Sequence, residues 1–192
     1  MRKFFYAVAA ILVASCTLHA QKPTQGQSVE WQAIGEASQA EAGQKHYFID
    51  FYTSWCGWCK RMDQSTFQDP VVAAILNQFY IPVKFDAEGR ASFTWDGKAY
   101  SGVETPAGAR RATHPFTRAV LGQKIGYPSF AIFGPEQNLV TILQGYQSAY
   151  DFSMALWYIA SGDNMRYTFE NYQRIFDQEI KPAMMKKLGL AK

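Results

Sequence analysis

The chain has 192 residues, enough for one domain with a sizeable core, and 48% of them are hydrophobic, 16% aromatic and 18% charged. This composition excludes a disordered or collagen-like chain, and three cysteines are too few for a fold held together by a disulfide framework. The formal net charge of +3 gives no electrostatic case for binding nucleic acid.

Residues 1–20 have the pattern of an export signal. Met1-Arg2-Lys3 is positively charged, and the apolar run from Phe4 to Ala14 is shorter than the roughly 20 residues that span a bilayer as a helix. Cleavage after Ala20 would give a periplasmic protein. Val13-Ala14-Ser15-Cys16 resembles a bacterial lipobox instead, in which case Cys16 would carry the acyl chains of an envelope lipoprotein. Membrane contact is expected only through that anchor.

The first half of the chain after the signal alternates between predicted helices and strands. Residues 21–28 form a polar linker, and the domain proper covers 29–162. The predicted elements are a helix over 31–42 that ends at Gly43, a strand over 47–52, a helix from just after Cys56 to about Phe67, a helix over 71–79 that is capped by Asp69 and begins at Pro70, and a strand over 80–86.

The second half contains an insertion, a hairpin and a helical tail. The predicted elements are an insertion over about 87–124 with a short hairpin over 92–100, two paired strands over 129–133 and 139–144, a helix over 150–160, and a C-terminal helical extension over 163–192. In the extension, Met165, Phe169, Tyr172, Ile175 and Phe176 follow a helical stripe expected to pack on the domain, and Pro182 should end or kink the helix. The order indicates an α/β fold with a mixed sheet.

Cys56 and Cys59 carry the chemistry that the sequence predicts. Trp55-Cys56-Gly57-Trp58-Cys59-Lys60 follows a buried strand directly and stands where a helix begins. The positive end of the helix dipole and the unpaired backbone N–H groups there favour thiolate over thiol, and thiolate is the species that attacks disulfides. We therefore expect Cys56 to be the nucleophile and Cys59 to resolve the mixed disulfide. The redox pair requires no metal and no other cofactor.

Other interpretations of the pair are weaker. A structural zinc site needs four ligands, and neither His46 nor His114 has ligand-like spacing to the cysteines. Haem attachment needs histidine after the second cysteine, where Lys60 stands. An inert disulfide in a binding or scaffold protein remains an alternative function, and soft-metal handling of copper(I) by the dithiol is a further one.

Asp50 is the third predicted catalytic residue. It lies six residues before Cys56, inside an apolar strand where an unpaired carboxylate is costly. A carboxyl group of this kind can accept or return the proton of Cys59.

The segment from Asp50 to Lys60 resembles the active-site strand and turn of thioredoxin. Gly126-Tyr127-Pro128-Ser129 resembles the cis-proline loop of that family, and Gly145 resembles the glycine before its last helix. The resemblance implies a thioredoxin fold, a mixed central sheet flanked by helices, with an insertion before the cis-proline loop and an extra C-terminal helix. It also implies that Pro128 and Tyr127 bind the substrate backbone, while Trp55, Gly57 and Trp58 form a contact surface.

The helix at Trp31, the Trp-Cys-Gly-Trp-Cys-Lys core and the strand end Asp86-Ala87-Glu88-Gly89 resemble exported bacterial thioredoxin-like proteins, which act on disulfides in the cell envelope. The expected partners are therefore protein thiols and disulfides and an upstream envelope redox partner, and the expected state is a monomer. Gly-Trp replaces Gly-Pro between the cysteines. The lysine that thioredoxin places near its aspartate has no clear counterpart, because Pro82 falls nearest its position and Lys84 is expected to point elsewhere.

The insertion has two interpretations. It could form a wall or lid that selects the partner, with Trp95, Tyr100 and Phe116 as contact surface and Arg110 and Arg111 as charge. Alternatively, its aromatic side chains bury themselves against the domain. We favour burial for the individual side chains and the partner-selecting role for the position of the segment.

Overall fold

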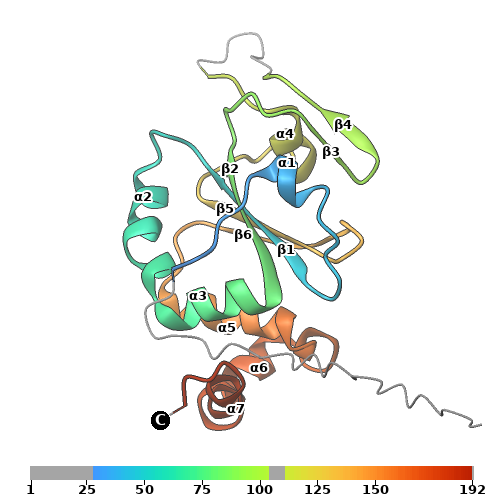
Figure 1. Ribbon diagram of the computed structural model, residues 1–192. Coiled ribbons are helices and arrows are strands. Elements are labelled where there is room, and N and C mark those ends of the chain that lie inside the picture. The colour runs from blue at the N-terminus through green and yellow to red at the C-terminus, as the bar shows by residue number, and fades with distance from the viewer. Residues whose placement is uncertain (1–27, 104–110, 192) are drawn as a thin grey trace, which may run out of the picture.

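A four-stranded mixed sheet in the order β2-β1-β5-β6 forms the middle of the protein (Figure 1). Strands β1 (His46–Tyr52) and β2 (Tyr80–Asp86) are parallel, whereas β5 (Ser129–Phe133) and β6 (Leu139–Gln144) form an antiparallel hairpin that pairs with β1 through β5. β1 and β5 consist almost wholly of buried residues because helices or the insertion cover both faces of the sheet. All four strands were predicted at nearly these bounds.

The computed structural model describes residues 28–103 and 111–191. The predicted export signal with Cys16, nearly all of the linker over 21–28, and Arg110 therefore lie outside the described residues. Within the described ranges, no helix is both long enough and apolar enough to cross a membrane.

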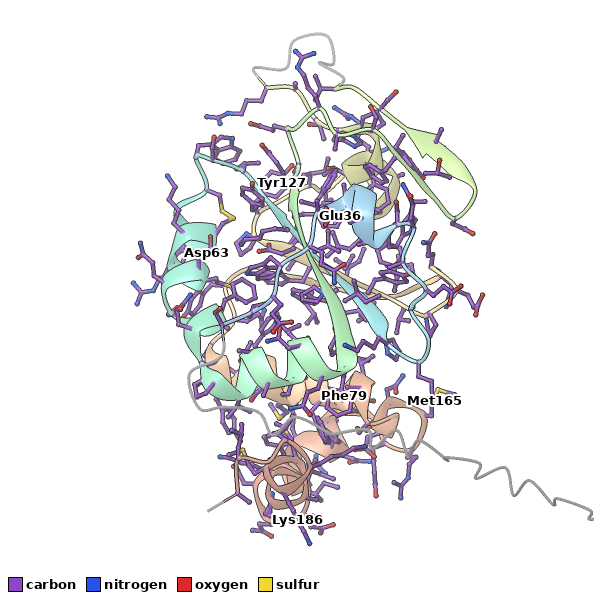
Figure 2. The ribbon with its side chains drawn as sticks, in the orientation of Figure 1. Glu36, Asp63, Phe79, Tyr127, Met165 and Lys186 are labelled. Atoms are coloured by element: carbon purple, nitrogen blue, oxygen red, sulfur yellow. A yellow bond between two sulfur atoms is a disulfide. The ribbon has the colours of Figure 1, made fainter. Side chains whose placement is uncertain are left out.

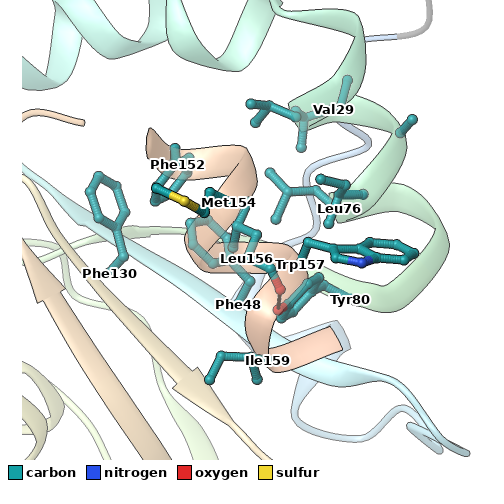
Figure 3. Packing of buried hydrophobic residues seen from close by; sticks show 14 of the residues in the cluster. Val29, Phe48, Leu76, Tyr80, Phe130, Phe152, Met154, Leu156, Trp157 and Ile159 are labelled. Atoms are coloured by element: carbon teal, nitrogen blue, oxygen red, sulfur yellow. Dashed lines mark hydrogen bonds between the residues drawn. The ribbon is translucent and has the colours of Figure 1, made fainter. Parts of the chain in front are cut away.

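One face of the sheet is covered by α3 (Pro70–Phe79) and α5 (Ala149–Ala160), and the C-terminal helices pack beyond these two (Figure 1). Figure 3 shows the core on this side, where Phe48 and Phe130 meet Phe152 and the hydroxyl of Tyr80 donates to the carbonyl of Leu156 at 2.6 Å. Asp69 caps α3 by accepting from the N–H groups of two following residues, as the sequence predicted.

The other face is covered by α1 (Ile34–Ala37), the hairpin β3 (Phe93–Trp95) and β4 (Lys98–Tyr100), and α4 (Pro115–Leu121). Trp95 and Phe116 are buried here and contact the ring of Phe133 from the central sheet. The predicted hairpin is confirmed, with Asp96 and Gly97 both at positive φ in its two-residue turn. The aromatic side chains of the insertion thus extend the core.

The predicted helix over 31–42 is wrong, because only the single turn of α1 forms. Gln32 adds a parallel bridge to the edge of β2, with its N–H donating to Pro82 and its carbonyl accepting from Lys84. This pairing keeps the chain before Ile34 extended. Gly43 does adopt positive φ, but the helix has already ended at Ala37, so Gly43 is not its cap.

The helix that follows Cys56 is shorter than predicted. α2 covers Gly57–Gln64, the chain breaks at Ser65, and a 3₁₀ turn, η1, covers Thr66–Gln68. The hydroxyl of Thr66 donates to the carbonyl of Gln147 at 2.7 Å, which ties this break to the loop before α5.

The C-terminal extension packs back on the domain as predicted, in more pieces than expected. A 3₁₀ turn η2 (Asp163–Met165) is followed by α6 (Phe169–Ile175), a π-helical segment η3 (Phe176–Ile180) and α7 (Lys181–Lys187). Tyr172 and Phe176 are buried, but Met165 is 85% exposed, so its place in the predicted apolar stripe is wrong. Pro182 stands at the start of α7, directly after the π-helical segment, in which the N–H of Lys181 donates to the carbonyl of Phe176, so the regular α-helical pattern is interrupted just before the proline. The sheet order and these helices agree with the predicted thioredoxin fold.

Candidate redox site

Cys56 and Cys59 form a disulfide at the N-terminus of α2. Cys56 is the N-cap residue, and its Sγ accepts a hydrogen bond from the backbone N–H of Cys59 at 3.0 Å. Both cysteines are almost fully buried, so a partner can reach the sulfur atoms only by close contact with the surrounding surface. The N–H group and the helix dipole are placed to stabilise negative charge on Cys56 when the pair is reduced.

Trp55 flanks the disulfide on one side and is 47% exposed. Its indole N–H donates to Glu88 at 3.0 Å, and the guanidinium of Arg111 stacks 4.0 Å from its ring centroid. The ring also meets Tyr127 edge-on at 5.9 Å. These contacts bring the insertion, through Glu88 and Arg111, and the proline loop, through Tyr127, together at Trp55 beside the redox pair.

Trp58 flanks the disulfide on the other side and is 58% exposed. Its ring lies 5.5 Å from that of Tyr146, and the guanidinium of Arg61 lies about 6 Å from both ring centroids. Tyr146 belongs to the loop between β6 and α5. Trp58 was predicted from the sequence but Arg61 and Tyr146 were not, since nothing in their local pattern indicates that the loop meets α2.

The Tyr127–Pro128 peptide bond is cis, as the resemblance predicted. The Pro128 carbonyl accepts from the N–H of Gly145, and the hydroxyl of Ser129 donates to the Gly126 carbonyl at 2.7 Å. Gly145 has a φ of 89°, which favours glycine at this crossing of the two loops. Figure 2 labels Tyr127 in this loop and Asp63 on α2, the two elements on either side of the redox turn.

Asp50 is fully buried on β1, opposite Lys84 on β2 and Phe130 on β5. Lys84 Nζ lies 2.5 Å from its Oδ2, while its Oδ1 has no hydrogen-bond partner within the described part of the chain. Burial raises the pKa of Asp50 to about 6, and the nearby Lys84 ammonium limits the rise. The group therefore changes protonation state close to neutral pH, as a proton donor and acceptor must.

The expectation that Lys84 points away from Asp50 is wrong. The parallel register of β1 and β2 places the two residues directly opposite each other, and Lys84 also pairs with Asp63 on α2. The rings of Trp31, Tyr52 and Phe67 surround the ammonium at centroid distances of 4.9, 5.2 and 5.0 Å. Burial lowers the pKa of Lys84, but the two carboxylates outweigh it and the net direction is upward.

No site for a metal ion is formed by the residues described. Across 28–103 and 111–191 there is no group of three or more histidine, cysteine, aspartate or glutamate side chains that could hold one. His114 instead caps α4, accepting from the N–H of Phe116 and bonding through its other ring nitrogen to the carbonyl of Ala91 at 2.9 Å.

A protein family and a curated protein match parts of this chain. The sequence profile of the family described as "Thioredox_DsbH: Protein of unknown function, DUF255" matches residues 14–105, just under half of the chain. The "Thiol:disulfide interchange protein DsbD" of Vibrio vulnificus is 45% identical over 42 residues, which are 22% of this chain and only 7% of that protein.

Two solved structures are similar over most of their length. A candidate disulphide isomerase from Bacteroides thetaiotaomicron is 22% identical, with a TM-score of 0.49, over 70% of this chain and 95% of its own. A thioredoxin from Thermus thermophilus is 18% identical, with a TM-score of 0.49, over 74% of this chain and 98% of its own.

The fold and the site together define the class. A mixed sheet in the order β2-β1-β5-β6, a Cys-x-x-Cys disulfide at the start of α2, and a cis-proline before β5 give this protein a thioredoxin fold with a cysteine pair placed as a redox centre.

Proposed function

We propose that this protein catalyses thiol–disulfide exchange on protein substrates in the cell envelope. The observation that carries the proposal is the position of the Cys56–Cys59 disulfide, at the cap of α2 and between two exposed tryptophans. The Vibrio relative, a thiol:disulfide interchange protein, supports the same chemistry over the short segment that matches. The envelope location rests on the export pattern of residues 1–20.

The exchange takes two steps. With the pair reduced, the Cys56 thiolate attacks one sulfur of a substrate disulfide, so that a mixed disulfide forms and the other substrate sulfur leaves as a thiolate. Cys59 then loses its proton and attacks Cys56 Sγ, which releases the remaining substrate sulfur as a thiolate and restores the Cys56–Cys59 disulfide. In total two electrons pass from the dithiol to the substrate. The same steps run in reverse when the protein oxidises a substrate dithiol.

Asp50 and Pro128 support these steps. We assign to Asp50 the uptake of the Cys59 proton, because its pKa of about 6 lets it accept a proton near neutral pH and return it to solvent. Pro128 and Tyr127 lie in the loop that meets Trp55, and we assign to them the docking of an extended substrate backbone beside the sulfur atoms. Gly57, between the two cysteines, leaves open space on that side of the helix.

Reduction of insulin by dithiothreitol tests the proposal. The wild-type protein should accelerate precipitation of the insulin B chain, and Cys56→Ser should return the rate to that of dithiothreitol alone. Cys59→Ser should keep the first step and block the second, so that mass spectrometry detects protein joined to substrate through Cys56. Wild-type turnover in Cys56→Ser, or no mixed disulfide in Cys59→Ser, would refute the mechanism.

A further inference from the structure

The outward face of α2 beside the redox disulfide is basic and hollowed. A depression of about 380 Å³ is lined by Gly57, Trp58, Lys60, Arg61 and Gln64. Its lining contains two cations and no carboxylate. Cys59 and Met62 face the interior from the same helix, so the hollow and the redox pair share one short segment.

Arg61 is held in place without an ion pair. Its guanidinium lies 6.0 Å from the Trp58 ring centroid and 5.8 Å from that of Tyr146, so two rings position the charge. Among the described residues, neither Lys60 nor Arg61 takes part in a salt bridge. Asp63, the one acid of α2, is engaged by Lys84 on the other side. The positive charge of this face is therefore available to a partner.

The surface around Trp55, on the other flank of the disulfide, differs in charge from the surface around Trp58. There Glu88 accepts from the indole N–H while Arg111 stacks on the ring, so a carboxylate of the chain itself offsets the cation. Among the described residues, the cation beside Trp55 is thus accompanied by a carboxylate, whereas the two cations beside Trp58 are not.

We infer that this hollow, whose charge comes from Lys60 and Arg61, binds an acidic segment of the protein substrate next to its reacting cysteine. The inference rests on the proposed exchange activity and adds a substrate class to it. Carboxylates complement the two free cations, and a bidentate contact with a guanidinium that is already positioned loses little side-chain freedom. The exposed rings of Trp58 and Tyr146 supply apolar contact around that charge.

Two synthetic peptides test this inference. Both peptides have the same length and a single cysteine, whose sulfur is joined through a disulfide to a 5-thio-2-nitrobenzoate group. The acidic peptide has aspartate beside the cysteine and the basic peptide has lysine there. Reduced protein attacks the peptide sulfur through Cys56 and releases coloured 5-thio-2-nitrobenzoate; Cys59 then attacks Cys56 Sγ and releases the peptide thiol. The readout is the ratio of the acidic-peptide rate to the basic-peptide rate, which cancels any change in the intrinsic reactivity of the cysteines.

We expect a ratio of about 5 at low ionic strength, as for an exposed charge pair, and a ratio near 1 at high salt. Lys60→Gln should lower the ratio, and Arg61→Glu should reverse the preference. Lys98→Gln is the matched control, because Lys98 is also exposed and its Nζ lies 5.1 Å from the ring centroid of Tyr100. Lys98 belongs to the insertion hairpin and not to α2, so this variant should keep the wild-type ratio.

A low-salt ratio of 1 in the wild type, or a ratio that Arg61→Glu leaves unchanged, would overturn the inference while leaving exchange activity intact. The inference would also be overturned if the wild type bound phosphatidylglycerol vesicles, Arg61→Glu did not, and the peptide ratio were 1. That result would assign the hollow to lipid. If neither peptide reacts faster than with Cys56→Ser, the proposed function itself fails.

Discussion

Asp50→Asn replaces a buried ionisable carboxyl group with a neutral amide of nearly the same shape. Burial raises the pKa of Asp50 from 3.8 to about 6 in the folded protein. Between these two values the folded protein binds the proton more tightly than the unfolded chain, so wild-type stability falls as pH rises through this interval and is level above it. The variant has no titrating group at this position. The stability difference between variant and wild type must therefore grow over the same interval.

The size of the effect follows from the two pKa values. A difference of about two pKa units, at about 1.36 kcal/mol for each, corresponds to roughly 3 kcal/mol. Relative to the wild type, Asp50→Asn should gain up to this much free energy of unfolding between pH 4 and pH 8. Lys84 retains Asp63 as a partner in the variant, so its ammonium is not left without a carboxylate.

Urea denaturation of the oxidised proteins between pH 4 and pH 8 measures this difference. Glu179→Gln serves as the control, because Glu179 is an exposed acid on the C-terminal extension and its loss should not produce a pH-dependent difference of this size. A difference between Asp50→Asn and wild type that stays constant or shrinks as pH rises would refute the account of the buried carboxyl group.

Three further changes have defined outcomes. Lys84→Met removes the cation that limits the rise in the pKa of Asp50, so that pKa should rise further. Asp50 then accepts the Cys59 proton only at higher pH, and the rate of mixed-disulfide release, measured by rapid quench, should shift to higher pH. Phe116→Ala empties a fully buried site in the insertion core and should cost about 3–5 kcal/mol of unfolding free energy in urea. Asp69→Ala removes the cap of α3 and should cost about 1 kcal/mol in thermal unfolding; unchanged stability would contradict the cap's role.

Features with a strong local cause were predictable from the sequence. Runs of β-branched and aromatic residues located the four strands of the sheet, and Asp69-Pro70 marked the start of α3 because both side-chain capping and proline geometry act within one turn. The Cys-x-x-Cys pair and the cis-proline were found through a resemblance that spans the site.

Features set by contacts between distant segments were not predictable. The helix predicted over 31–42 does not form at its start, because Gln32 pairs with β2 in an extended conformation. Backbone pairing with a distant strand overrides the local helix propensity of this segment. The position of Lys84 opposite Asp50 depends on the register between two strands, which the sequence of a single segment does not reveal. A charged residue within the apolar strand β2 was the available signal, since such a residue needs a buried partner. Tyr146 reaches α2 only through the loop that follows β6.

The redox potential of the Cys56–Cys59 pair tests the central claim most directly. Titration against glutathione or dithiothreitol buffers, with the dithiol fraction measured by alkylation and mass spectrometry, gives its value. Catalytic exchange predicts a potential between about −120 and −270 mV, the range of known dithiol oxidoreductases. A pair that stays oxidised below about −300 mV would contradict catalysis and identify the disulfide as a structural element of a binding protein.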